Sequence, residues 1–147
     1  MAAGRIRVVG LGPAGPDLVT AGTLAAIEAT PRRFVRTRRH PAVEVLGAAA
    51  DVVAFDDLYD AASTMDEVYG GIVDRLVQAA AEGDVLYAVP GSPLVAERTV
   101  QLLLADPRAD CEVLAALSFL DLLWVRLGVD PMAAGVQVVD GHDFAVE

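Results

Sequence analysis

An apolar segment that runs directly into a glycine- and proline-rich loop restricts the fold of this chain most strongly. Residues 6–9 are largely apolar, Gly10, Gly12 and Pro13 follow, and a helical segment begins near Thr20. Glycine lets the backbone approach a ligand closely because it has no Cβ. The first turn of a helix adds free N–H groups and the positive end of a dipole. The segment therefore predicts an α/β fold with a cofactor-binding loop after its first strand.

The first loop also has the glycine spacing of a dinucleotide-binding turn, counted from Gly10. In such a turn the helix begins near the second glycine, where Pro13 and Pro16 would interrupt it. The segment 37–40 is basic, whereas NAD is usually bound by an acidic residue in this region. A basic segment would suit the 2′-phosphate of NADP. The spacing leaves open an NADP-binding Rossmann-type enzyme and a turn that binds no ligand.

The composition excludes several classes of protein. The chain has 147 residues, 54% of them hydrophobic, which is enough for one packed core. Its formal net charge of −10 disfavours binding to nucleic acid or to a membrane surface. A single cysteine, Cys111, allows no internal disulfide, so we expect a cytoplasmic setting. We expect no metal site.

Strand-like and helix-like segments alternate along the chain. This alternation, with apolar strands, predicts a parallel sheet of about five strands covered by helices on both faces. The predicted strands are 6–9, 33–36, 52–55, 85–89 and 112–114, and the predicted helices are 20–29, 42–49, 64–82, 95–104 and 118–127. The clearest helix opens at Thr64, because Glu67 completes a capping box, and Gly83 closes it.

The last residues depart from this alternation. Residues 135–139 predict one more strand, and none of the other predicted strands is free to pair with it. We therefore divide the chain into a cofactor-binding α/β subdomain, 1–128, and the truncated start of a second α/β subdomain, 129–147. An unpaired strand exposes its backbone and its apolar face. We expect it to pair with a second copy in a homodimer, or otherwise to fold over the cofactor cleft.

A second loop of glycine and proline follows the strand 85–89. It reads Pro90-Gly91-Ser92-Pro93, and a third strand end carries Leu117 and Ser118, of which Ser118 is a good N-cap. Ligands of open α/β sheets bind at the carboxyl ends of the strands. The two loops should therefore form one pocket, which requires the strands 6–9 and 85–89 to be adjacent.

Together, these segments resemble the tetrapyrrole (corrin/porphyrin) methylase family, which uses S-adenosylmethionine. The first loop resembles the family's Gly-x-Gly-Pro-Gly element, the second its Gly-Asp-Pro loop, and the segment 114–118 its serine-bearing element. The segments 37–41, 55–59, 93–99 and 116–121 more narrowly resemble the methylase-like domain fused ahead of MazG-type nucleotide pyrophosphohydrolases. The resemblance implies that the cofactor is bound by Gly10, Gly12, Pro13, Pro90, Gly91, Ser92, Pro93, Leu117 and Ser118.

The resemblance implies an S-adenosylmethionine-dependent methyltransferase unit that acts on a small-molecule acceptor. It also implies a homodimer, with a MazG domain following in the intact protein. Ser92 stands where the family has an aspartate, which favours a second hypothesis, a cofactor-binding or regulatory module without chemistry. No catalytic base is identified, and His40 and Asp57 are the polar candidates near strand ends. We expect Gly12→Val and Gly91→Val to block cofactor binding with little loss of fold.

Overall fold

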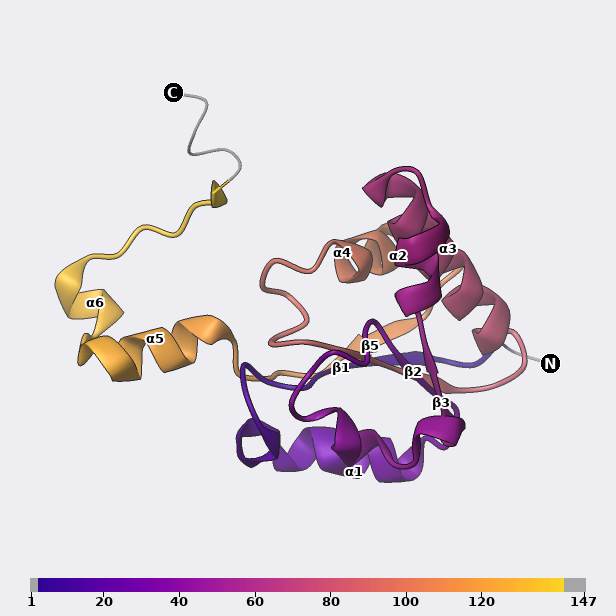
Figure 1. The fold of residues 1–147 in the computed structure, drawn as a ribbon, viewed down its shortest axis with the longest axis horizontal. Helices are drawn as coiled ribbons and strands as arrows, with labels where there is room; N and C mark the ends of the chain where they lie inside the picture. Colours follow the sequence, from indigo (N-terminus) through magenta and orange to yellow (C-terminus); the bar gives the residue numbers. More distant parts are fainter. Residues whose placement is uncertain (1–2, 142–147) are drawn as a thin grey trace.

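A five-stranded, fully parallel sheet forms the centre of the molecule (Figure 1). The computed structural model describes residues 3–141. The strands lie in the order β3-β2-β4-β1-β5 across the sheet. Their bounds are Ile6–Gly10 for β1, Arg33–Val35 for β2, Val52–Ala54 for β3, Val85–Val89 for β4 and Cys111–Val113 for β5. The predicted α/β class, with its parallel sheet, is confirmed.

The central pair of strands is β1 and β4, which the loop argument predicted to be neighbours. Their register aligns Ile6 with Val85 and Gly10 with Val89. The chain leaves β1 toward β2 and β3, and it leaves β4 toward β5 on the other side. The connections after β1 and β4 therefore run in opposite directions along the sheet. At such a switch point, folds of this kind open a crevice at the carboxyl ends of the strands.

Helices cover both faces of the sheet, with α1 on one face and α2, α3 and α4 on the other (Figure 1). Local capping explains several of the helix starts: the hydroxyl of Thr20 accepts the amide of Thr23, and that of Thr64 accepts the amide of Glu67. The α-helix bounds are Ala21–Ala29 for α1, Asp56–Ala61 for α2, Met65–Ala80 for α3, Arg98–Ala105 for α4, Phe119–Leu127 for α5 and Pro131–Ala134 for α6. No helix in residues 3–141 has the length and apolarity needed to cross a membrane.

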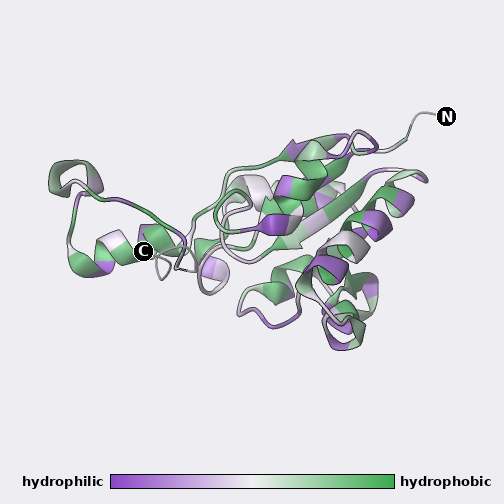
Figure 2. Cartoon of the chain, turned by 90° about the horizontal axis from the view of Figure 1, so that it is seen from above, coloured by the Kyte–Doolittle hydropathy of each residue, from purple (hydrophilic) through white to green (hydrophobic). Residues whose placement is uncertain are grey.

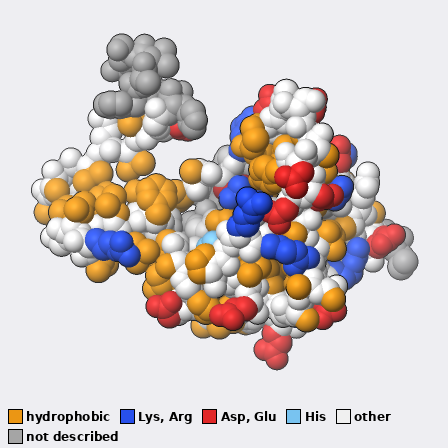
Figure 3. Space-filling view, viewed as in Figure 1, with side chains coloured by type: hydrophobic (Ala, Val, Ile, Leu, Met, Phe, Trp, Pro, Cys, Tyr) orange, Lys and Arg blue, Asp and Glu red, His pale blue; other side chains and the backbone are white. Residues whose placement is uncertain are grey.

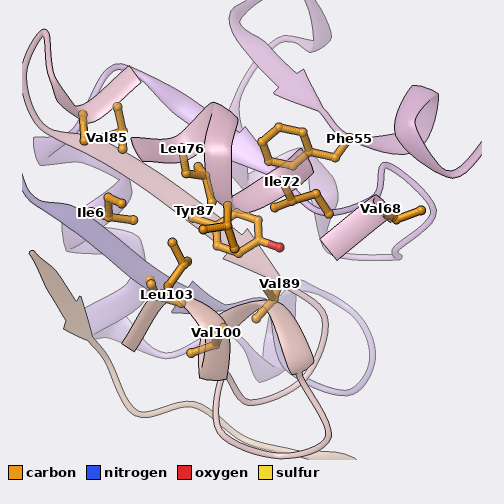
Figure 4. Close-up of a cluster of buried hydrophobic side chains, with 13 residues drawn as sticks. Ile6, Phe55, Val68, Ile72, Leu76, Val85, Tyr87, Val89, Val100 and Leu103 are labelled. Atoms are coloured by element: carbon orange, nitrogen blue, oxygen red, sulfur yellow. The ribbon is translucent and has the colours of Figure 1, made fainter. Parts of the chain in front are cut away.

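Two apolar clusters hold the layers together, because alternate strand residues point to opposite faces. On one face, Tyr87 packs between α3 and α4, and its ring meets that of Phe55 edge to face at 6.0 Å (Figure 4). On the other face, Leu86 and Ala88 pack toward Ile27 of α1. Figure 2, in which the sheet is seen from above, shows the largely apolar strands at the centre of the molecule. The sheet is thus buried on both sides at its centre.

Two predicted helices differ from the structure, and one short helix was missed. Residues 42–49 form two short 3₁₀ turns, Val43–Leu46 and Ala49–Asp51, in place of a helix. The helix expected from residue 95 begins only at Arg98, because Ala96 has a φ of 55° that no right-handed helix contains. The short helix α2 was not predicted.

Toward its end, the chain leaves the body as an arm made of α5, α6 and residues 135–141 (Figure 1). The predicted strand 135–139 is wrong, since residues 136–140 have no regular structure. A strand requires a partner to satisfy its backbone groups, and this segment lies apart from the sheet. The arm exposes many apolar side chains, which are Phe119, Leu123, Val125, Leu127, Met132, Val136, Val138 and Val139. Residues 142–147 of the predicted second subdomain lie outside the described residues.

Candidate functional site

Two glycines join the loops that follow β1 and β4. The amide of Gly91 donates to the carbonyl of Gly12 at 2.9 Å, and the amide of Gly12 donates back to the carbonyl of Gly91 at 3.2 Å. Both glycines have positive φ, 77° at Gly12 and 65° at Gly91, which glycine adopts without strain. The two loops therefore form one unit at the centre of the sheet edge, as the pocket argument required.

A hollow of about 260 Å³ lies at this edge. Its walls are mostly backbone and small or apolar side chains, and its few polar groups are a histidine and two serines. The lining residues are Gly12, Pro13, His40, Pro90, Gly91, Ser92, Val95, Ala96, Ser118 and Phe119. This composition resembles that of small-molecule sites, which are mainly apolar with a few placed polar groups.

The hollow brings together six of the nine predicted cofactor-binding residues, from three separate strand ends. Gly10, Pro93 and Leu117 do not line it. A Cβ on Gly10 would lie 2.2 Å from the carbonyl oxygen of Gly91 and 2.6 Å from the Cβ of Ala116. Gly10 thus allows the close packing of the loops. The six that line the hollow are Gly12, Pro13, Pro90, Gly91, Ser92 and Ser118.

His40 connects the loop after β2 to this unit. Its Nδ1 accepts the amide N–H of Ala42 at 3.0 Å, so the ring proton lies on Nε2. Nε2 then donates to the carbonyl of Gly12 at 2.9 Å. Both ring nitrogens are engaged by the backbone, which makes His40 a structural wall of the hollow. In this arrangement, neither nitrogen is free to take a proton from a substrate.

Ser118 lines the hollow and also begins α5. Its hydroxyl accepts the amide of Leu120 at 3.2 Å, and its own amide donates to the Asp121 carboxylate at 2.7 Å. This reciprocal capping box fixes the helix start and holds the buried Ser118 at the hollow. The neighbouring Phe119 is 56% exposed and lines the hollow as well.

Three lining residues, Val95, Ala96 and Phe119, were not predicted from the sequence. Val95 and Ala96 fell inside a predicted helix, and the left-handed conformation of Ala96 has no signal in the sequence. Phe119 follows Ser118 directly, so an N-cap at Ser118 could have indicated that the next side chain lies at the same strand end.

A second hollow, of about 340 Å³, lies beside the loop after β2. Asp56 lines it and also fixes that loop, because its carboxylate accepts the Thr37 hydroxyl at 2.6 Å and the Arg38 amide at 2.9 Å. Burial raises the pKa of Asp56, but these hydrogen bonds outweigh it and lower the pKa below its ordinary value. The lining residues are Arg36, Thr37, Arg39, Asp56, Tyr59 and Asp60, and Figure 3 shows basic and acidic side chains grouped on the face that carries α2.

Asp57, the other predicted polar candidate, lines neither of these hollows. It lies on α2 and pairs with Arg75 of α3 at 3.2 Å, where both side chains are largely exposed. Its position is that of a surface ion pair. Within residues 3–141, no group of histidine, cysteine, aspartate or glutamate side chains is arranged to hold a metal ion.

The fold and the central hollow define an α/β domain of the class whose small-molecule sites lie at the carboxyl ends of parallel strands. The family model of the Tetrapyrrole (Corrin/Porphyrin) Methylases matches residues 5–141 of the sequence, and the chain belongs to this family. It is 40% identical to the uncharacterized protein YabN of Bacillus subtilis (strain 168), over 99% of this chain and 30% of that protein.

Several solved structures have a similar fold. Uroporphyrin-III C-methyltransferase from Thermus thermophilus aligns with a TM-score of 0.63 and 27% identity, over 86% of this chain and 54% of that chain. A structure of the Thermus enzyme complexed with S-adenosyl homocysteine has a TM-score of 0.54 at 24% identity, over 80% of this chain and 46% of that one. Diphthine synthase aligns with a TM-score of 0.62 and 17% identity, over 86% of this chain and 50% of that chain. At this identity the likeness shows a shared fold alone. The chain thus spans about half of these solved chains and 30% of YabN.

Proposed function

We propose that this chain is the S-adenosylmethionine-binding part of a methyltransferase, and that the central hollow holds the cofactor. The single observation that carries this proposal is the paired Gly12–Gly91 unit at the switch point of the sheet. Membership of a family that uses S-adenosylmethionine supports it and favours this cofactor over NADP. When bound, the cofactor supplies a methyl group on a sulfonium.

The residues of the hollow fit such a cofactor. A Cβ built on Gly91 would meet no atom within 4 Å, so the backbone there faces open space that a ligand can approach. Pro13 and Pro90 have no N–H and stiffen the two loops. Ser92 supplies a hydroxyl group that can donate or accept hydrogen bonds, whereas the Ser118 hydroxyl is engaged by Leu120 and Asp121 at the start of α5. In this proposal the chain positions the cofactor through its backbone and excludes water with Val95 and Phe119.

Calorimetric titration tests the proposal. The protein should bind S-adenosylmethionine and S-adenosyl homocysteine, and it should not bind NADPH. Gly91→Val should abolish this binding while the circular dichroism spectrum stays unchanged. Binding of NADPH alone would refute the proposal in favour of a Rossmann-type enzyme.

A second candidate is a binding or regulatory module that carries out no reaction, and the lack of a free acid or base among the polar groups of the hollow favours it. Ser92 stands where the family has an aspartate, and both ring nitrogens of His40 are hydrogen-bonded to the backbone. Transfer of a labelled methyl group by the intact protein to a panel of small-molecule acceptors separates the candidates. Tight binding without transfer to any acceptor would favour the regulatory module.

The wider organisation of the protein follows from the same proposal. We propose a division into subdomains at 1–128 and 129–147, a homodimer in the cytoplasm, and a MazG-type domain in the intact protein. The 30% coverage of YabN supports the idea that such proteins carry more than this domain.

A further inference from the structure

A buried carboxylate, that of Glu97, follows directly in the chain after Ala96, which lines the central hollow. The side chain of Glu97 is 6% exposed, although it carries a charge and stands at the start of α4. Its Oε1 accepts the hydroxyl of Thr99 at 2.8 Å, and that hydroxyl accepts in turn from Tyr87 at 2.8 Å. A buried charge is costly unless it is paired and hydrogen-bonded. The structure therefore holds Glu97 in one place with a network that reaches into the core.

The partner of this carboxylate comes from a different loop. Nε of Arg36, at the end of β2, lies 3.1 Å from Oε2 of Glu97. The guanidinium also donates through Nη1 to the Tyr59 hydroxyl at 3.2 Å. Arg36 and Tyr59 both line the second hollow. The ion pair thus connects the loop after β4 with the loop after β2, and it joins Arg36 of the second hollow to the residue that follows Ala96 of the central hollow.

The residue next to Glu97 is strained. Ala96 has a φ of 55°, the left-handed conformation that is unfavourable for a residue with a Cβ. Ala96 lines the central hollow, and so does Val95, whose amide N–H donates a hydrogen bond to the carbonyl of Ser92 and closes a turn. Such strain persists only where the surrounding structure fixes it. The anchored neighbour on the helical side of Ala96 is Glu97.

We propose that Glu97 is a positioning residue for cofactor binding, which holds the loop 92–96 in its strained shape against the central hollow through its pair with Arg36. The inference rests on the proposed function, because it concerns the same hollow. It assigns to a side chain outside the hollow the task of shaping one of its walls.

The decisive variant is Glu97→Gln, which keeps the size of the side chain and removes its charge. The affinity for S-adenosyl homocysteine, measured by calorimetry, should fall about tenfold or more, because small displacements of a positioning wall have large effects. Glu82→Gln is the matched control, since Glu82 is exposed and pairs with Arg32 at 3.6 Å far from the hollow. It should leave the affinity unchanged.

Rescue distinguishes a positioning role from a merely structural one. Glycine adopts the conformation of residue 96 without strain, so Ala96→Gly added to Glu97→Gln should restore most of the affinity. Ala96→Gly alone supplies the reference, and the loss of affinity caused by Glu97→Gln should be much smaller in the Ala96→Gly background than in the wild-type protein. If Glu97→Gln fails to fold, Arg36→Gln breaks the same ion pair from the other loop, and wild-type affinity in that variant would overturn the inference.

Amide hydrogen exchange supplies a measurement that needs no ligand. The amide hydrogen of Val95 is hydrogen-bonded to the carbonyl of Ser92. It should exchange faster in Glu97→Gln and at the wild-type rate in Glu82→Gln. Wild-type affinity and exchange in Glu97→Gln would overturn the inference and leave the proposed function standing. Absence of binding by the wild-type protein, with faster Val95 exchange in Glu97→Gln, would refute the proposed function and leave the positioning of the loop standing.

Discussion

Gly12 and Gly91 exchange two backbone hydrogen bonds, yet their missing side chains would point into very different surroundings. A Cβ on Gly12 would lie 2.7 Å from the carbonyl oxygen of Leu18, whereas a Cβ on Gly91 would meet nothing within 4 Å. Both Gly12→Val and Gly91→Val were expected to block cofactor binding with little loss of fold. We now expect a valine at position 12 to destabilise the fold as well. The space at Gly12 is filled by the protein's own backbone.

Gly12→Ala should destabilise the fold by roughly 3 kcal/mol, because positive φ and an overpacked backbone contact each cost energy. Gly91→Ala should cost only about 1 kcal/mol, from φ alone, and should weaken cofactor binding. Urea denaturation compares the two variants. Equal free energies of unfolding would show that Leu18 can move away from the added methyl group.

His40→Ala should loosen the central hollow, because it removes two hydrogen bonds to the backbone, at Gly12 and Ala42. At about 0.5–1.5 kcal/mol each, their loss should lower the free energy of unfolding by about 1–3 kcal/mol and weaken the binding of S-adenosyl homocysteine. Arg39→Ala is the control, since that side chain is exposed and lines the second hollow, not the central one. A methyltransferase activity lost with unchanged stability and affinity would instead assign His40 to chemistry.

Asp56→Asn should change how stability depends on pH. The pKa of Asp56 is lowered in the folded state from an ordinary value of 3.8, since hydrogen bonds from Thr37 and Arg38 outweigh burial. Its stabilisation is then fully present above about pH 4 and is lost as the pH falls through the folded-state pKa. The variant should be less stable by about 1 kcal/mol at pH 7.

The difference in the free energy of unfolding between wild type and Asp56→Asn should become smaller below about pH 4. Urea denaturation across the acid range measures it. Asp60→Asn, which removes a neighbouring exposed carboxylate, serves as the control. A constant difference at every pH would mean that Asp56 acts through its shape alone.

Thr64→Ala should cost about 1 kcal/mol, because the Thr64 hydroxyl caps α3 by accepting the Glu67 amide at 3.2 Å. The Glu67 carboxylate accepts the amide of Ser63 at 2.9 Å, one residue before the position that a capping box predicts. Ser63→Ala keeps this backbone amide and should be nearly neutral. Thermal unfolding ranks the two variants, and equal losses would contradict the capping role of Thr64.

The predicted homodimer now requires a different surface, because the strand expected to form it is absent from residues 136–140. Val125 and Leu127 on α5 are 78% and 60% exposed, and burying such side chains in a second copy would be favourable. Light scattering should show a dimer, which Val125→Glu should convert to monomer. A monomer at high concentration would refute the dimer.

The sequence by itself determined the repeating strand–loop–helix units and the starts of several helices. These features depend on interactions within a few residues: Thr20, Thr64 and Ser118 each cap a helix that follows directly, and Gly128 ends α5 in the left-handed conformation. The neighbouring positions of β1 and β4 also followed, because their two loops had to share one pocket. Six of the nine predicted cofactor-binding residues meet there for the same reason.

Only the tertiary structure decided the features that depend on distant partners. The strain at Ala96 and the late start of α4 accompany the pair of Glu97 with Arg36, whose residues are far apart in the sequence. His40 reaches a carbonyl in another loop, which no local pattern indicates. Residues 135–139 have the apolar pattern of a strand, but a strand forms only where another strand accepts its hydrogen bonds. A local pattern specifies what a segment can form, and the partners brought by the fold decide what it does form.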